Sequence, residues 1–237
     1  MGKHQHPNRS ISILSKTERP MKERLHPKKN DKGEPVILNA PSIPTDLTTW
    51  SDPEATAVVV PEGPMPQELN GIPFLPWESP PVTPPQWNSV VVKSVIEEPA
   101  FVCPAGRKAA AGIVLIESDG RVWLIAPSNA FGGYTVTFPK GRVESGITRQ
   151  ASAIKEVFEE CGLRAQITGF LADSTRSRTH TRYYLGKRVG GTPSDMGWES
   201  QAVLLAPLSA LERLLTNAND QPLIEALKRP RMSVSKR

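Results

Sequence analysis

The sequence has few of the residues that disulfide frameworks and thiolate metal sites require. Only two cysteines, Cys103 and Cys161, occur among its 237 residues, and they lie far apart. Two distant cysteines form neither a disulfide framework nor a metal site, so we expect a reducing compartment. Apolar runs are also short, and none reaches the length of a membrane span or of a secretory signal core. We therefore expect a soluble, cytoplasmic protein with no membrane contact.

Two further functional patterns are absent. His180 has no Cys or His neighbour at metal-ligand spacing, so we expect it to be structural or exposed. The segment GGYT at 132–135 has two glycines but lacks the G-x-G-x-x-G pattern of dinucleotide-binding proteins. The sequence therefore predicts neither a histidine metal site nor a dinucleotide-binding fold.

Basic residues are concentrated at the two ends of the chain. Residues 1–33 hold nine Lys/Arg against three Asp/Glu, and residues 228–237 hold five against none. The middle of the chain is left with 15 basic and 21 acidic residues, so the net charge of +5 describes the ends only. We expect 1–33 and 229–237 to be basic disordered tails, and the alternative is that they contact nucleic acid or a membrane.

Proline is concentrated before the main body of the chain. Sixteen of the 24 prolines fall in the first 90 residues, and GIPFLPWESPPVTPPQW at 71–87 is incompatible with a regular helix. The segment 34–90 also carries Trp50, Phe74 and Trp87, which are costly to leave in water. We expect a Pro-rich extended arm that lies against the following domain, or alternatively one that binds a partner.

From residue 91 to 228 the pattern is typical of an α/β domain. Strands are expected at 90–96, 110–117, 121–126, 134–138, 163–171, 181–186 and 201–206, with a hairpin turn at 118–120. Helices are expected at 149–161, from Pro207 onward and at 221–228. Thr148 is the expected N-cap of the first helix, and Gly162 is its expected stop. The order of elements favours a mixed sheet packed by helices.

Three glutamates crowd one face of the helix expected at 149–161. Glu156, Glu159 and Glu160 are spaced i, i+3 and i+4, so their side chains project together. They repel one another, and at the C-terminal end of a helix they oppose the macrodipole. A hard divalent cation would remove both penalties, because Mg²⁺ and Mn²⁺ prefer carboxylate and phosphate oxygens. The alternative is a solvated acidic face.

The segment PKGRVESGITRQASAIKEVFEECGL at 139–163 resembles the Nudix box of the Nudix hydrolases. That pattern is a glycine, five residues, a glutamate, seven residues and then R-E-apolar-x-E-E-x-G-apolar. Gly141 takes the first place, and residues 155–163 take the last nine. The resemblance implies an α/β/α sandwich with a mixed sheet over 91–228, and residues 1–89 lie outside it.

The sequence departs from the family pattern at two positions. The family's glutamate is replaced by Ile147, and its arginine by Lys155. In the family these two charges are thought to support the geometry of the loop and helix. Because both positions change together, no unpaired partner remains. We expect Ile147 to pack inward and Lys155 to point to solvent.

The resemblance implies hydrolysis of a pyrophosphate bond in a nucleoside diphosphate linked to another group, or in a related dinucleoside or diphosphoinositol polyphosphate. It implies that the Gly141 carbonyl, Glu156 and Glu160 bind Mg²⁺ or Mn²⁺. Glu159 would be a further ligand or the base that acts on water. Many members take a glutamate from a later loop, and Glu199 in MGWES is the candidate here, although it could also be a solvated surface residue.

Basic residues near these segments could hold the phosphates of a small, nucleotide-like substrate. The candidates are Lys140, Arg142, Arg176, Arg178 and Arg182. For each of them the alternative is an exposed basic side chain with no ligand.

Two other functions stay open. Ile147 and Lys155 favour a non-catalytic Nudix-fold module that binds a nucleotide or a protein. The basic tails favour an enzyme that acts on RNA 5′ ends, since they would attract its phosphates. The three retained glutamates favour catalysis, because a protein that had lost its activity would have no reason to keep mutually repelling acids.

Overall fold

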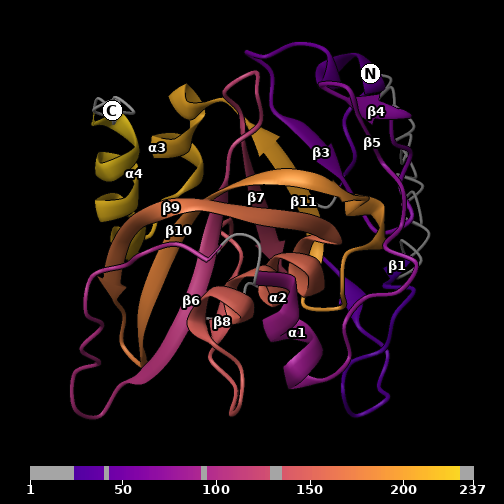
Figure 1. The fold of residues 1–237 in the computed structure, drawn as a ribbon. Helices are drawn as coiled ribbons and strands as arrows, with labels where there is room; N and C mark the ends of the chain where they lie inside the picture. The colour runs from indigo at the N-terminus through magenta and orange to yellow at the C-terminus, as the bar shows by residue number, and fades with distance from the viewer. Residues whose placement is uncertain (1–23, 40–42, 92–94, 129–134, 230–237) are drawn as a thin grey trace, which may run out of the picture.

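The computed structural model describes residues 24–39, 43–91, 95–128 and 135–229 (Figure 1). Residues 1–23 of the expected N-terminal tail and 230–237 of the expected C-terminal tail lie outside these ranges. Among the residues described, no helix is long and apolar enough to cross a membrane.

Two sheets form the centre of the molecule (Figure 1). The first is mixed and has the order β8-β6-β10-β9: β6 and β10 are parallel, and the other two pairs are antiparallel. Its strands are β6 (Lys108–Leu115), β8 (Lys140–Arg142), β9 (Leu163–Thr175) and β10 (Thr179–Gly191). The second sheet is antiparallel with the order β3-β11-β7. Its strands are β3 (Ala57–Val59), β7 (Val122–Pro127) and β11 (Ser200–Ala206).

Helices cover both faces of these sheets. Strand residues alternate between the faces, so Val203 and Leu205 pack in one apolar cluster with Ile154, whereas Leu204 packs in another with Leu223. The first cluster contains α1 (Pro84–Val91) and α2 (Arg149–Cys161), and the second contains α3 (Leu211–Leu214) and α4 (Gln221–Lys228). The expected α/β/α sandwich is confirmed, with two sheets in its middle layer.

Most of the predicted elements of the domain are confirmed, and three predictions are wrong in part. The described residues of the strand expected at 90–96 do not form it, because Val90 and Val91 end α1 and residues 95–96 are irregular. The described part of 134–138 forms only the bridge between Thr137 and Ile125. The helix expected from Pro207 is a 3-10 turn, Leu208–Ala210, followed by the four residues of α3.

Part of the Pro-rich stretch is helical, which corrects the prediction for 71–87. The helix α1 begins at Pro84 and Pro85. Proline is tolerated in the first turn, where a backbone N–H has no helical acceptor. Gln86 accepts hydrogen bonds from the backbone N–H groups of Val82 and Thr83, at 3.0 Å each, and so fixes the start of the helix.

The described part of the expected N-terminal tail is ordered, which corrects the prediction for residues 24–33. Residues 24–33 belong to a hairpin in which β1 (Arg24–Leu25) pairs with β2 (Ile37–Leu38). Its turn is closed by Asn30, whose side-chain oxygen accepts from the backbone N–H groups of Lys32 and Glu34. These local bonds explain why a polar, basic segment is ordered without an apolar core of its own.

The Pro-rich arm packs against the domain. It contains a 3-10 turn at Leu47–Trp50, the strand β3, and a short hairpin of β4 (Glu68–Leu69) with β5 (Ile72–Pro73). The ring of Trp50 lies 5.8 Å from that of Phe74 and 6.0 Å from that of Trp123 in β7. These aromatic residues are therefore buried within the chain itself, and nothing supports the alternative of an arm held open for a partner.

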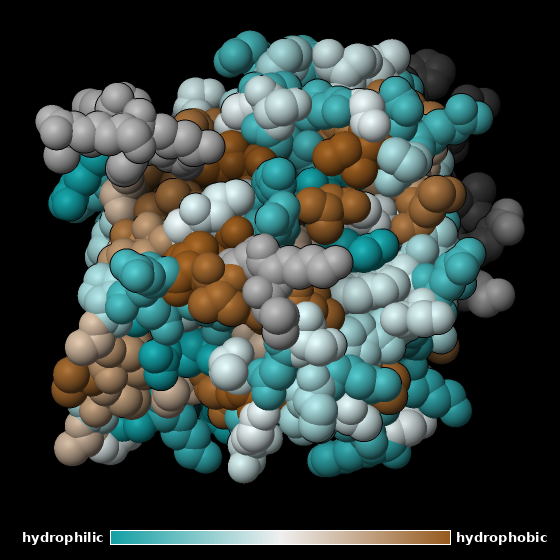
Figure 2. All heavy atoms as spheres, viewed as in Figure 1, coloured by the Kyte–Doolittle hydropathy of each residue, from teal (hydrophilic) through white to brown (hydrophobic). Residues whose placement is uncertain are grey.

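Figure 2 shows one surface of the molecule, on which hydrophobic and hydrophilic residues are interspersed.

Candidate metal and catalytic site

The helix α2 begins and ends at the residues that the sequence predicts. The Thr148 hydroxyl accepts a hydrogen bond from the backbone N–H of Ala151 at 3.3 Å. Gly162 has φ +67° and donates its N–H to the Phe158 carbonyl at 2.8 Å. A left-handed residue at this position favours glycine and ends the helix sharply.

The three glutamates of α2 have different surroundings. Glu156 and Glu160 are only 8% and 7% exposed, whereas the side chain of Glu159 is 46% exposed. The apolar side of the helix is formed by Ala151, Ile154 and their neighbours in the first core cluster. Two carboxyl groups are therefore carried toward the interior beside this apolar stripe.

Gly141 allows Glu156 to lie against the backbone of β8. A Cβ on Gly141 would come within 2.1–2.2 Å of all three carboxyl-group atoms of Glu156, so only glycine fits. The backbone N–H of Lys140 donates to Glu160 at 2.6 Å. Strand β8 is held in turn by β6, where Gly141 pairs with Ala111. The structure thus brings together Gly141, Glu156 and Glu160.

Both buried carboxyl groups favour their protonated form. Burial raises the pKa of Glu156 to about 9, and the charges of Glu160 and Glu159 contribute. Burial raises the pKa of Glu160 to about 8, although the Lys140 ammonium opposes that shift. A carboxyl pair of this kind gains most from a cation that neutralises it, and its oxygen donors suit Mg²⁺ or Mn²⁺.

The residues of this cluster suit a metal ion because they offer oxygen ligands and lie close together. Within the described ranges, no three His, Cys, Asp or Glu side chains are gathered closely enough to hold a metal ion as they stand. Glu156 and Glu160 could be joined by the Gly141 carbonyl, since the glycine leaves its backbone uncovered by a side chain. These groups, with Glu159, are the residues present that could hold the ion.

Lys155 is not directed to solvent, which corrects the prediction. Its side chain is 13% exposed and donates to Glu144 at 2.8 Å and to Glu159 at 2.5 Å. Ile147 is 7% exposed and packs in the first core cluster, as expected. The charge support of the loop is therefore retained, with Glu144 in place of the acid missing at 147. Glu144 was missed in the sequence, although it lies only three residues before Ile147.

Glu199 lies close to the cluster on a separate loop. The loop is tied to α2 because the N–H of Gly197 donates to the Glu159 carbonyl at 2.7 Å. It is tied to the end of β7 because Ser128 donates its N–H to the Glu199 carbonyl at 2.7 Å. Burial raises the pKa of Glu199, and the charges of Glu159 and Asp31 raise it further. Asp31 comes from the β1–β2 hairpin, and no sequence motif pointed to it.

The basic candidates divide between the site and the core. Lys140 adjoins Glu160. Burial lowers the pKa of Lys140, and the charge of Glu160 partly offsets this by raising it. Arg142 is exposed at the end of β8, and Arg178 is exposed in the turn between β9 and β10. Arg176 is buried and donates to Asp220 at 2.6 Å.

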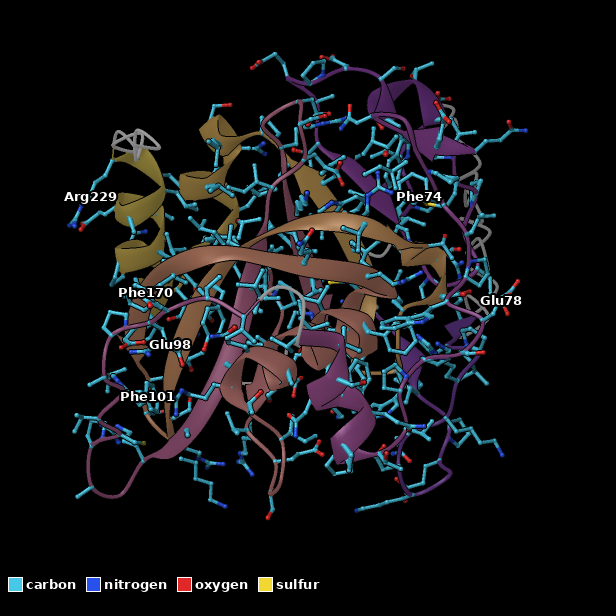
Figure 3. All side chains as sticks on the ribbon, viewed as in Figure 1. Phe74, Glu78, Glu98, Phe101, Phe170 and Arg229 are labelled. Carbon is cyan, nitrogen blue, oxygen red and sulfur yellow. The ribbon has the colours of Figure 1, made fainter. Side chains whose placement is uncertain are left out.

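Arg182 is fully buried, and its guanidinium is hydrogen-bonded to β9 and to the segment before β6. It binds both carboxylate oxygens of Asp173, at 2.8 and 2.7 Å, and donates to the Pro99 carbonyl at 2.6 Å. Its guanidinium also lies 4.9 Å from the ring centres of Phe101 and Phe170, which Figure 3 labels close together near one end of the sheet. These contacts hold the segment before β6, so Arg182 is not part of the substrate site that we propose.

A family profile described as NUDIX domain matches residues 106–227. The match covers half of the chain and includes Gly141, the three glutamates of α2 and Glu199. The chain belongs to the NUDIX domain family.

Curated relatives resemble about half of the chain. A Mycobacterium tuberculosis protein named "Putative mutator protein MutT4" is 30% identical over 130 residues, covering 49% of this chain and 52% of that protein. An RNA pyrophosphohydrolase of Shewanella piezotolerans is 32% identical over 121 residues, covering 49% of this chain and 66% of that protein. The matched part thus spans half to two thirds of these relatives. Among solved structures, a C. elegans Ap4A hydrolase is 21% identical with a TM-score of 0.42, covering 50% of this chain and 92% of that one.

Proposed function

We propose that this protein is a divalent-metal-dependent hydrolase that cleaves a pyrophosphate bond in a nucleoside diphosphate-linked or related polyphosphate substrate. The observation that carries the proposal is a pair of buried carboxyl groups on the backbone of β8: Glu156 lies against Gly141, and Glu160 accepts the N–H of Lys140. Folding gains nothing from placing two acids there, and a metal–phosphate complex would compensate their charge. Relatives named for pyrophosphate cleavage support the same class of reaction.

In this proposal the Gly141 carbonyl, Glu156, Glu159 and Glu160 hold Mg²⁺ or Mn²⁺. When bound, the ions would neutralise the diphosphate and lower the pKa of the attacking water. Lys155 directs the Glu159 carboxylate along the helix face, because its ammonium donates to that carboxylate at 2.5 Å.

Glu159 or Glu199 would accept the proton of the attacking water. The water oxygen bonds to one phosphorus, the bond from that phosphorus to the bridging oxygen breaks, and two phosphate products leave. Glu199 suits this step because its raised pKa favours uptake of a proton. Glu159 suits it because it is the more exposed of the three helix acids.

Lys140, Arg142 and Arg178 are the basic residues that we propose for the substrate phosphates. Arg142 and Arg178 are exposed, and Lys140 is beside Glu160. Arg176 would act less directly, since Asp220 already binds it. A second candidate substrate is the 5′ end of an RNA, which the relatives named RNA pyrophosphohydrolase favour.

A substrate screen of the full chain tests the proposal. Dinucleoside polyphosphates, ADP-ribose, nucleoside triphosphates, diphosphoinositols and 5′-triphosphorylated RNA are offered with Mg²⁺ and with Mn²⁺. Glu160→Gln should abolish turnover of whichever substrate is cleaved, and Glu225→Gln, an exposed acid on α4, should leave it unchanged. Failure to cleave any of them, with no change in melting temperature on adding either ion, would favour the non-catalytic binding module instead.

A further inference from the structure

The β1–β2 hairpin lies outside the NUDIX match yet contacts the loop that carries Glu199. Residues 24–38 form the hairpin, and the loop is Asp195–Glu199. Two side chains of the hairpin reach this loop across 167 positions of sequence.

The first contact fixes the start of the loop. The ammonium of Lys28 donates to the backbone carbonyl of Asp195 at 2.5 Å. Lys28 is itself oriented by His26, whose ring nitrogen accepts the Lys28 backbone N–H at 2.9 Å. His26 is buried, so this part of the hairpin has little freedom to move away from the loop.

The second contact fixes the residue next to Glu199. The indole N–H of Trp198 donates to the carboxylate of Asp31 at 3.1 Å. The turn that carries Asp31 is closed by its own hydrogen bonds, including Gly33 N–H to the Asn30 carbonyl at 2.8 Å. A side-chain carboxylate on a rigid turn can hold an indole in one orientation.

The other side of the loop rests on α2. The N–H of Gly197 donates to the Glu159 carbonyl, and a Cβ on Gly197 would lie 2.2 Å from that oxygen. The close approach therefore requires glycine. Met196 is buried in the first core cluster and anchors the same segment. The loop is thus held between the helix of the candidate metal site and the N-terminal hairpin.

We infer that the β1–β2 hairpin is a positioning element of the active site, which acts through Lys28 and Asp31 to hold the Asp195–Glu199 loop against the C-terminal end of α2. The inference rests on the proposed function, because it gives Glu199 a defined place beside Glu159. Lys28 and Asp31 are positioning residues that act on the loop and do not themselves contact the substrate. A segment outside the family domain thereby completes the site.

The test compares full-length variants of both partners. Asp31→Ala and Trp198→Phe each remove the contact, and Asp31→Asn keeps an oxygen acceptor without the charge. The exposed neighbour Lys29→Ala is the control. We expect Asp31→Ala and Trp198→Phe each to lower kcat about tenfold with KM unchanged, as loss of an outer supporting contact does. Asp31→Asn should restore most of kcat, and the double variant should fall no further than the single ones.

A second measurement does not depend on turnover. Hydrogen exchange at the amides of Gly197 and Ser200 reports the loop directly, since both donate hydrogen bonds within the protein. Asp31→Ala should accelerate their exchange, and Lys29→Ala should not. Unchanged exchange, additive losses in the double variant, or an effect on KM alone would overturn the inference. If the wild type cleaves nothing, the proposed function fails, and the exchange rates still decide whether the hairpin holds the loop.

Discussion

Buried charged groups are paired with partners where the Pro-rich arm meets the domain, whereas two buried acids lie together on the acidic face of α2. The arm is fastened to the domain by buried arginines: Arg121 donates to the Trp50 carbonyl at 2.5 Å, and Arg188 to the Leu69 carbonyl at 2.8 Å. Arg121 also binds Asp119, in the turn before β7, at 2.8 Å, and Arg188 binds Glu117, which follows β6, at 2.6 Å. On α2, by contrast, two carboxyl groups, Glu156 and Glu160, are buried close together, and the pKa values of both are raised.

The paired arginines stabilise the fold, whereas the two acids of α2 destabilise it. A buried ion with a full set of partners accounts for its own position, and replacing one partner leaves the other uncompensated. A buried carboxyl group whose pKa is raised to about 8 or 9 lacks partners that fully compensate its charge, so its position needs another cause. A ligand that brings positive charge is the simplest cause for Glu156 and Glu160.

The largest effect that this comparison predicts is the loss of an arginine clamp. Arg188→Met leaves Glu117 buried, with the Trp123 indole and Asn70 amide as its remaining partners. The free energy of unfolding should fall by about 3–5 kcal/mol. Urea unfolding measures the loss, and Lys187→Met, an exposed residue of the same strand, is the matched control. A loss no greater than that of the control would mean that the clamp does not hold the arm.

The next effect concerns the position where the sequence departs from the family pattern. Ile147→Glu would place a carboxylate in the first core cluster while Lys155 is already engaged by Glu144 and Glu159. We expect the free energy of unfolding to fall by about 3 kcal/mol, with no gain in activity. The control Ile147→Val should cost about 1 kcal/mol. If Ile147→Glu raised kcat instead, Glu144 could not be the acid that supports the loop.

The candidate site and its surroundings also show what a sequence can and cannot predict. Thr148 and Gly162 were predictable from helix capping and local backbone geometry, and Gly141 from the resemblance to the Nudix box. Glu144 was within reach, since it lies in the same loop as Ile147. The contact of Asp31 with Trp198 joins residues 167 positions apart, and the buried pairing of Arg182 depends on a segment with no regular structure. Contacts of this kind follow from tertiary packing, which periodicity and motifs do not encode.

A smaller effect should appear in the pH dependence of stability. The pKa values of Glu156 and Glu160 in the folded protein, about 9 and about 8, lie above their ordinary value of 4.5. Below pH 4.5 both carboxyl groups are protonated in the folded and in the unfolded protein. As the pH rises toward 8 and 9 the unfolded chain releases these protons first, so the metal-free protein should lose stability over this interval.

Glu160→Gln removes one of these groups. It should therefore stabilise the metal-free protein by about 1–2 kcal/mol at pH 9 and hardly at all at pH 5. Melting curves across this range measure the difference, with Glu225→Gln as the exposed control. Mn²⁺ should raise the melting temperature of the wild type more at high pH than at low pH, because binding displaces protons. A wild-type stability that rises between pH 5 and 9 without metal would contradict the raised pKa values of the two acids.

The smallest effect on stability is expected at Lys155, which is paired with one acid of α2 and one acid of the preceding loop. Its partners Glu144 and Glu159 are about half exposed, so water screens both ion pairs. Glu144→Gln should lower the free energy of unfolding by only about 0.5 kcal/mol. Lys155→Gln should cost a similar amount, and the two losses should combine to less than their sum, because both variants break the same bond. Turnover should separate them: Lys155→Gln also frees Glu159 and so should lower kcat more than Glu144→Gln does. Equal kcat values would mean that Lys155 supports the loop alone and leaves the orientation of Glu159 to the helix.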